Sequence, residues 1–103
     1  MRTILKVEIP VDIGNKKIRE GSLDKTIMSI LEEQKPEAVY FITFNGNRCG
    51  LIVLNIDDNS KMPALAEPWF LAFNATVEFF PAMVPADLAK AGKDFERIVK
   101  TYG

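Results

Sequence analysis

Residues 37–56 decide the fold, because they hold two strand-like segments joined by a short polar turn. The first segment, 37–44, reads EAVYFITF, and the second, 49–56, reads CGLIVLNI. Both are rich in β-branched and aromatic residues, which favour strands. The sequence therefore predicts a β-hairpin in the middle of the chain.

The polar turn between these segments reads Asn45-Gly46-Asn47-Arg48. We expect Gly46 and Asn47 to occupy the two central positions of a tight primed turn, because both tolerate positive φ. A two-residue turn at that place predicts three cross-strand pairs: Phe44 with Cys49, Ile42 with Leu51 and Tyr40 with Val53.

Upstream of the hairpin, residues 3–9 alternate with period two and predict a first strand that Pro10 ends. Residues 12–35 predict a broken helical connection. The connection has two helical segments, and Asp12 and Ser22 are their expected N-caps. We expect Gly21 to end the first segment in the left-handed conformation and Pro36 to end the second.

Downstream of the hairpin, a helix is predicted from the polar turn at 57–60 to about Phe73, with Pro63 in its first turn and Pro68 expected to kink or break it. Residues 75–80 predict a fourth strand, closed by Pro81. A last amphipathic helix is expected over 85–100. Its expected buried positions are Leu88, Phe95, Ile98 and Val99.

The resulting order is β-α-β-β-α-β-α, and its first six elements match the split βαβ, ferredoxin-like arrangement. We therefore expect one α+β domain over residues 1–103, with an antiparallel sheet in the order 4-1-3-2, two helices on one face and an extra C-terminal helix.

Both faces of the predicted hairpin are apolar. Val39 and Phe41 lie on one face, and Tyr40, Ile42 and Phe44 lie on the other. A strand with one solvated face should instead alternate apolar and polar residues. Two helices cover only one face, so the sequence predicts that a second copy covers the other in a homodimer. The alternative is that the polar C-terminal helix folds across it.

The element order and this doubly apolar hairpin, over residues 3–81, resemble the dimeric α/β-barrel superfamily. The segments Glu67-Pro68-Trp69-Phe70 and Pro81-Ala82-Met83 are similar to those of small bacterial proteins of that superfamily. The resemblance implies two ferredoxin-like sheets paired into a barrel. The superfamily includes muconolactone isomerases, antibiotic-biosynthesis monooxygenases, haem-degrading enzymes and chlorite dismutases, so the fold alone does not choose an activity. Its haem branches typically use a histidine ligand.

Composition excludes several classes of site. The chain has 13 basic and 14 acidic residues, no histidine and one cysteine, Cys49. A near-neutral chain is a poor candidate for general nucleic-acid or membrane-surface binding. The lack of histidine removes Ser-His-Asp and Cys-His catalysis and the usual zinc sites, and one cysteine cannot form an internal disulfide. We expect a cytoplasmic protein without metal or cofactor, since no signal peptide or membrane span is apparent.

A group of polar residues is predicted on the sheet face turned away from the helices. Strands one and four place there four polar side chains, and Tyr40 and Asn55 share the face if the hairpin points the same way. The expected ligand-binding residues are Lys6, Glu8, Tyr40, Asn55, Thr76 and Glu78. Glu78, Lys6 and Tyr40 are the candidates for acid/base catalysis. The structural alternative is a cross-strand ion pair between Lys6 and Glu78 at the rim.

Other residues favour structural roles. Cys49 is expected to be a small buried apolar residue rather than a reactive thiol. Arg48 is expected to be a solvated charge at the hairpin tip, and the aromatic residues Trp69, Phe70 and Phe73 are expected to belong to the core.

Three functions remain open from the sequence. The first is binding of a small organic molecule in the barrel interior of a homodimer. The second is a cofactor-independent isomerase or a monooxygenase acting on a small aromatic or lactone substrate. The third is an interaction module with no ligand.

Overall fold

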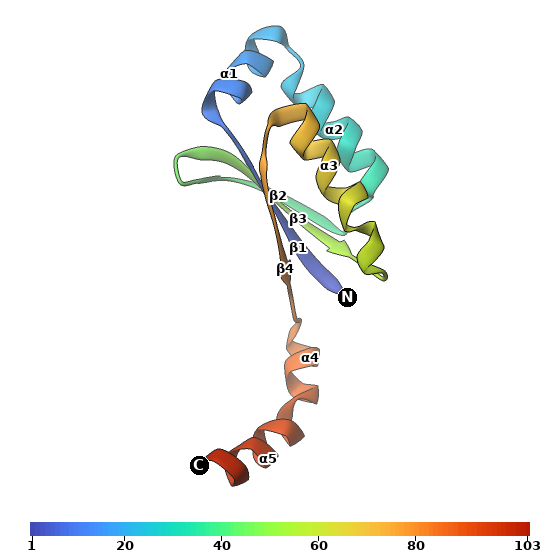
Figure 1. Cartoon of the computed structure of the whole chain (residues 1–103), viewed down its shortest axis with the longest axis vertical. Coiled ribbons are helices and arrows are strands. Elements are labelled where there is room, and N and C mark those ends of the chain that lie inside the picture. Colours follow the sequence, from blue (N-terminus) through green and yellow to red (C-terminus); the bar gives the residue numbers. More distant parts are fainter.

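A computed structural model describes all 103 residues as an α+β domain that continues into a C-terminal arm (Figure 1). The elements in chain order are β1 (Arg2–Ile9), α1 (Val11–Glu20), α2 (Leu23–Gln34), β2 (Ala38–Phe44), β3 (Asn47–Asn55), a 3-10 turn (Asn59–Lys61), α3 (Met62–Phe73), β4 (Thr76–Pro81), α4 (Pro85–Lys90) and α5 (Gly92–Tyr102).

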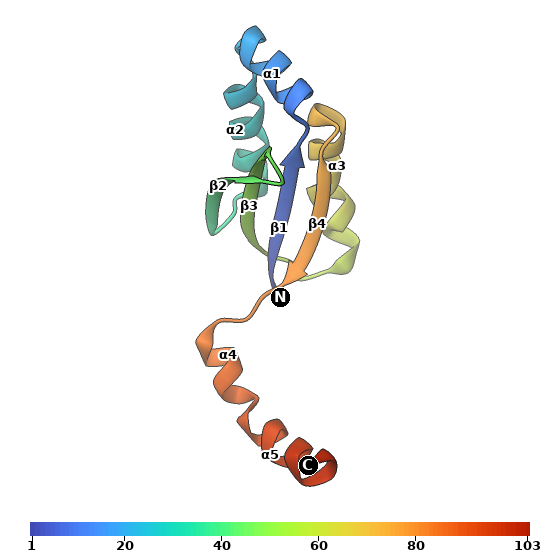
Figure 2. The same ribbon diagram turned by 90° about the vertical axis from the view of Figure 1, so that its left-hand side faces the viewer.

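The four strands form one open antiparallel sheet in the order β2-β3-β1-β4, which confirms the predicted order. Helices α2 and α3 lie on the same side of the sheet, and α1 lies beyond its upper end (Figures 1 and 2). No helix of the domain lies on the opposite side in these views. We call that side the open face. Along each strand, the side chains on the open face alternate with the side chains that α2 and α3 cover.

The core fills the space between the sheet and the two covering helices. Burial along β1 alternates strictly, as its period-two sequence requires. The largest fully buried side chains come from α3, β1 and β3: Trp69, Phe73, Leu5, Ile52 and Val7. Trp69 stacks on Phe73 with ring centroids 6.0 Å apart, and α2 completes the cluster with Leu23, Ile30 and Leu31. This single apolar layer fixes α2 and α3 on the sheet.

The hairpin turn lies one residue earlier than predicted. Asn45 and Gly46 are its central residues, with φ of 52° and 75°, so Phe44 pairs with Asn47. The predicted pairing of Phe44 with Cys49 is therefore wrong, and Ile42 pairs with Cys49 instead. Asn-Gly is the favoured sequence for a turn with two positive φ values. Because the pairing moves by two residues, every side chain keeps its predicted face.

The turn supplies a first testable prediction. At Gly46 a Cβ atom would meet nothing within 4 Å, so a substitution there acts through the backbone alone. Gly46→Ala forces a side chain into the left-handed region, and we expect it to lower the free energy of unfolding by about 1 kcal/mol. Chemical denaturation measures the change. Gly92, which also has open space but no positive φ, gives the control Gly92→Ala, and an equal loss there would contradict the explanation.

The helix ends differ in detail from the prediction. Helix α1 follows directly on Pro10, so Asp12 is not its N-cap and accepts a hydrogen bond only from the Ile13 N–H. Ser22 is the N-cap residue of α2 as predicted, but its side chain makes no capping hydrogen bond, and its Oγ donates to the Lys17 carbonyl. Gly21 ends α1 in the left-handed conformation, as predicted, with φ of 72°. Helix α3 continues through Pro68 to Phe73, so the proline does not break it.

The C-terminal helix is where the structure departs most from the prediction. Two helices, α4 and α5, replace the single helix expected over 85–100, and they extend away from the domain (Figure 2). Leu88, Phe95, Ile98 and Val99, which were predicted to be buried, are exposed. The radius of gyration is 17.4 Å, whereas a compact chain of about this length has about 13 Å. The burial prediction is therefore wrong for the single chain.

Candidate functional site

Three of the predicted site residues lie in one row across the open face. The strand register places Lys6 directly opposite Glu78 on β4 and opposite Leu51 on β3, which in turn is opposite Tyr40 on β2. Glu8 and Thr76 are opposite each other in the next row on the same face, beside Cys49. The sequence thus placed these residues on one face correctly, because β-strand periodicity fixes it.

Lys6 is the best-partnered member of this group. Its Nζ lies 3.5 Å from Glu78 Oε1 and 3.3 Å from the centroid of the Phe44 ring. The Lys6 side chain is 13% exposed, whereas that of Glu78 is 51% exposed. The ammonium group therefore has a carboxylate beside it and an aromatic face over it, which together stabilise its charge. The cross-strand ion pair that the structural alternative expected is therefore present, and its carboxylate end is solvated.

Glu8 and Cys49 lie opposite each other at the hairpin end of the open face. Glu8 Oε1 is buried and has no hydrogen-bond partner within the chain. Cys49 is 3% exposed. Burial is the largest cause that raises the pKa of the Cys49 thiol above its ordinary value, and the Lys6 ammonium offsets this in part. The thiol therefore stays protonated at neutral pH, which disfavours a nucleophilic role.

The state of this thiol gives a second prediction. We expect Cys49 in the native chain to react with a thiol reagent such as 5,5′-dithiobis(2-nitrobenzoate) at least about tenfold more slowly than in the urea-unfolded chain. Burial and the raised pKa both lower the fraction of accessible thiolate. The absorbance of the released thiolate, followed against time at pH 7.5, measures the rate. Equal rates in the two states would contradict the buried position.

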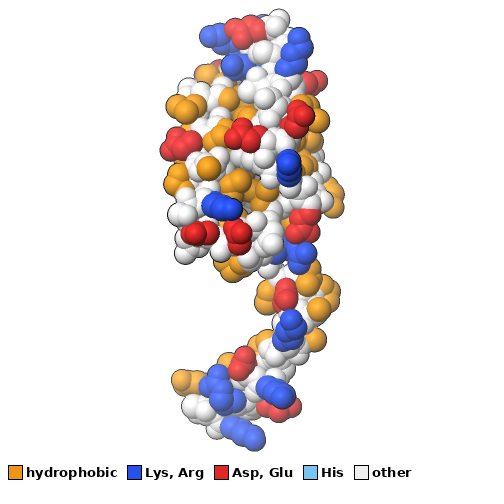
Figure 3. Space-filling model, turned by 90° about the vertical axis from the view of Figure 1, so that its right-hand side faces the viewer, with side chains coloured by type: hydrophobic (Ala, Val, Ile, Leu, Met, Phe, Trp, Pro, Cys, Tyr) orange, Lys and Arg blue, Asp and Glu red, His pale blue; other side chains and the backbone are white.

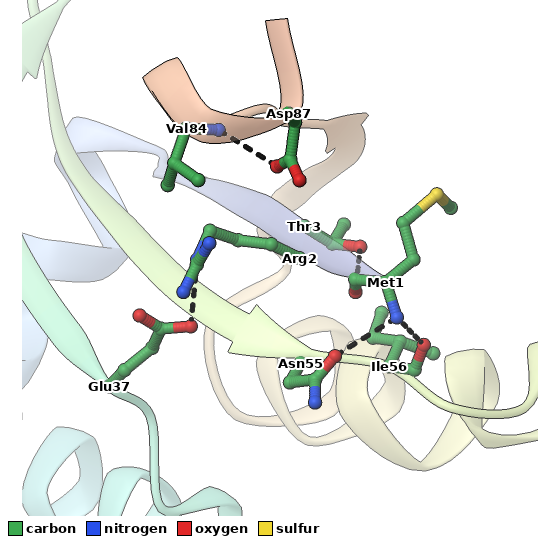
Figure 4. Close-up of polar contacts among 8 residues, drawn as sticks. All are labelled: Met1, Arg2, Thr3, Glu37, Asn55, Ile56, Val84 and Asp87. Atoms are coloured by element: carbon green, nitrogen blue, oxygen red, sulfur yellow. Dashed lines mark hydrogen bonds and ion pairs between the residues drawn. The ribbon is translucent and has the colours of Figure 1, made fainter. Parts of the chain in front are cut away.

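Asn55 does not join the other predicted site residues. It lies at the opposite end of β3, where the Met1 amino group donates a hydrogen bond to its Oδ1 over 2.9 Å (Figure 4). Arg2 pairs with Glu37 at the same end of the sheet, with 3.0 Å between Nε and Oε1. Asn55 therefore helps to hold the chain start onto β3, several rows away from Lys6.

A cavity lies on the other side of the sheet, between α2 and the β2–β3 hairpin. Its volume is about 560 Å³, within the range of about 300–1,000 Å³ typical of small-molecule sites. Most of its walls are apolar, and three polar or charged side chains, Asp24, Thr43 and Arg48, also line it. The lining residues are Val7, Ile9, Leu23, Asp24, Ile27, Met28, Phe41, Ile42, Thr43, Arg48, Cys49, Gly50, Ile52 and Trp69. The sequence predicted Trp69 to be a core residue and Arg48 to be a solvated charge, and it did not indicate the cavity.

Arg48 in the cavity wall is not the solvated tip charge that the sequence predicted. Its side chain is half-buried below α1, and its Nη2 donates a hydrogen bond to Asn15 Oδ1 over 3.0 Å. A Cβ atom at Gly14 would overlap Arg48 Nη1, so the glycine gives the guanidinium its space. Gly14 within a helical stretch was the available signal for this close approach. Arg48 takes part in none of the ion pairs of the chain.

No group of three or more acidic, cysteine or histidine side chains is arranged to hold a metal ion. None of the helices has both the length and the apolar character needed to cross a membrane. Comparison with protein-family models and with curated proteins finds no match to this sequence.

Proposed function

We propose that this protein is a homodimer that binds a small, mainly apolar organic molecule in the cavity between α2 and the β2–β3 hairpin. The observation that carries the proposal is the cavity itself, with its volume of about 560 Å³ and its largely apolar walls. Burial of apolar ligand surface supplies the affinity in such a site, and a few polar groups fix the orientation.

The polar groups of the cavity point to the chemistry of the ligand. Arg48 has five N–H donors, of which one contacts Asn15, and it forms no ion pair within the chain, although the Asp24 carboxylate also lines the cavity. A guanidinium in an apolar wall favours a carboxylate, because the charge-assisted bonds strengthen as water is excluded. The proposed ligand is therefore an aromatic or aliphatic carboxylic acid, with its apolar body between Leu23, Ile27 and Ile52.

The proposed dimer covers the open face of the sheet. Apolar members of that face, such as Ile4, Leu51 and Val53, remain only half-buried in the single chain. Its charged members balance, with Arg2 and Lys6 against Glu8 and Glu78, so an identical copy can pack there without burying net charge. This arrangement is the ferredoxin-like dimeric α/β barrel that the sequence resembles.

Within this dimer the row of Lys6 and Glu78 lies between the two sheets, and Tyr40 at its end lies on the edge strand β2. We assign this row to the orientation of the partner rather than to catalysis, because Lys6 already has Glu78 and Phe44 as partners. The buried Glu8 Oε1, which lacks a hydrogen bond within the chain, gains a donor from the partner or from trapped water in this arrangement.

Filling the cavity tests the ligand proposal. Gly50 lines the cavity, and a Cβ there would meet only Phe41, at 3.7 Å, so there is room for a larger side chain. We expect Gly50→Val to weaken binding of the probe 1-naphthoate at least about tenfold, because its methyl groups occupy ligand space. Isothermal titration calorimetry measures the affinity. Ser29→Val, on the exposed side of α2, is the control and should bind as the native chain does.

A neutral probe separates the role of Arg48 from that of the apolar walls. We expect 1-naphthalenemethanol to bind more weakly than 1-naphthoate to the native chain, and Arg48→Gln to remove that difference. If neither probe binds to the native chain, or if Gly50→Val binds both as well as the native chain, the assignment of the cavity as a ligand site is wrong.

A further inference from the structure

The C-terminal arm, residues 82–103, carries an apolar stripe with nothing packed against it. Phe95, Ile98, Val99 and Tyr102 follow the i, i+3, i+4, i+7 spacing of a single helix face on α5. Phe95 is 51% exposed and Tyr102 is 83% exposed. Figure 3 shows the arm standing clear of the domain, with hydrophobic side chains along its length. A face this apolar requires a partner in water.

The two helices of the arm are too short to be stable alone. Helix α4 has 6 residues and α5 has 11, whereas isolated helices of less than about 12–15 residues are marginal in water. No hydrogen bond or ion pair joins α5 to the domain in the single chain. Packing of the stripe against another surface must therefore hold the arm helical.

Hydrogen bonds at the start of the arm, which we call the arm root, direct the arm away from its own sheet. The Ala82 N–H donates to the Arg2 carbonyl over 3.0 Å, which continues the β1–β4 pairing past the end of β4. The Val84 N–H then donates to Asp87 Oδ2 over 3.0 Å and begins α4 (Figure 4). The hydrogen bond to Glu37 is the main cause that raises the pKa of the Arg2 guanidinium, and Asp87 lies near enough to raise it further. These contacts set the direction of the arm at its first turn.

The strand with the most exposed large apolar side chains is β2, at the other edge of the sheet from β4. Residues 40–44 are all exposed, and four of them are Tyr40, Phe41, Ile42 and Phe44. We call this stretch the β2 edge. A long, hydrophobic, unpaired edge strand invites aggregation unless something covers it. The β2 edge lies at the hairpin end of the sheet, whereas Pro81 and the arm root lie at the opposite end, beside Thr3.

We propose that the two protomers exchange their arms, so that the α5 stripe of each protomer packs on the β2 edge of its partner. The proposal rests on the homodimer proposed above. A protomer cannot bring its own stripe to its own β2 edge while the root contacts hold, because the arm leaves from the far end of the sheet and points outward. A second copy presents the same edge with no such restriction. The occupant of the edge is thus a segment of this chain.

Paramagnetic labelling of mixed protomers tests the exchange. A spin label on Lys100→Cys, in a Cys49→Ala background, lies on the polar side of α5. When this chain is mixed with ¹⁵N-labelled native chain, we expect amide signals of residues 40–44 to broaden in the unmodified copy. Broadening that occurs only when label and ¹⁵N share one chain would show an arm folded on its own domain. The absence of broadening in both samples would show a free arm, and either result overturns the proposal.

Substitution within the stripe provides the matching affinity test in the full-length chain. We expect Phe95→Glu to raise the dissociation constant of the dimer at least about tenfold, since it places a charge in the proposed contact. Lys93→Glu changes more charge on the polar side of the same helix and should leave the dimer intact. A native chain that is a monomer at every concentration contradicts the proposed dimer itself. A dimer that Phe95→Glu leaves unchanged contradicts only the arm exchange.

Discussion

Phe73→Ala is expected to lower the free energy of unfolding by about 3–5 kcal/mol, because it removes a large aromatic side chain from a closed core. Phe73 is 0% exposed and stacks on Trp69, so its loss leaves a cavity between α3 and the sheet. For a small domain, about 3 kcal/mol corresponds to a fall of about 12–24 °C in Tm. Urea denaturation, monitored by the fluorescence of Trp69, measures the free energy of unfolding. Trp69 reports on this site because it stacks on Phe73 in the native chain.

An outward-facing residue of the same helix is the control for this prediction. Leu71 is 82% exposed, and Leu71→Ala should change the free energy of unfolding by no more than about 0.5 kcal/mol. If Phe73→Ala were as mild as Leu71→Ala, α3 would not be docked on the sheet through this residue. The cavity walls that depend on Trp69 would then be misplaced as well.

Val53→Glu is expected to dissociate the proposed homodimer, because it places an unpaired carboxylate at the centre of the open face. The residue lies on β3 between Ile4 and Ala38, and it is half-buried in the single chain. Burial of an unpaired charge at an interface costs about 3 kcal/mol or more, so the dissociation constant should rise about 100-fold or more. Sedimentation velocity over a concentration series measures this shift.

Two further measurements separate dissociation from unfolding. Circular dichroism of Val53→Glu should keep the native spectrum, because the open face of a lone protomer is accessible to water. Ser29→Glu introduces the same charge on the exposed side of α2 and should leave the association unchanged. A folded Val53→Glu chain that associates as tightly as the native chain would show that the open face is not the interface.

The strands, their order and their faces could be predicted from the sequence because local rules fix them. Period-two alternation in residues 3–9 determines which side chains of β1 are buried, and it holds without exception. Lys6 and Glu78 were expected on one face for the same reason, and the register brings them together. The turn was misplaced because Asn45-Gly46 and Gly46-Asn47 both allow positive φ, and only the observed pair gives the favoured Asn-Gly order.

The errors concern contacts between residues far apart in the chain. Arg48 was predicted to be a solvated charge at the hairpin tip. The space for its side chain comes from Gly14 of α1, which lies 34 positions earlier in the chain, and no local pattern indicates that contact. The α2–hairpin cavity was missed because apolar residues that line a cavity have the same periodicity as residues that fill a core. The amphipathic pattern of residues 92–102 predicts that α5 needs a partner surface. It carries no information on which surface that is.

The measurement that tests the central claim most directly is sedimentation equilibrium of the native full-length chain. One chain has a mass of 11.6 kDa. If a second copy covers the open face, the measured mass should be twice this value at micromolar concentrations and above. A mass of one chain at every concentration would contradict the claim, and the dimer and the exchanged arms would fall together.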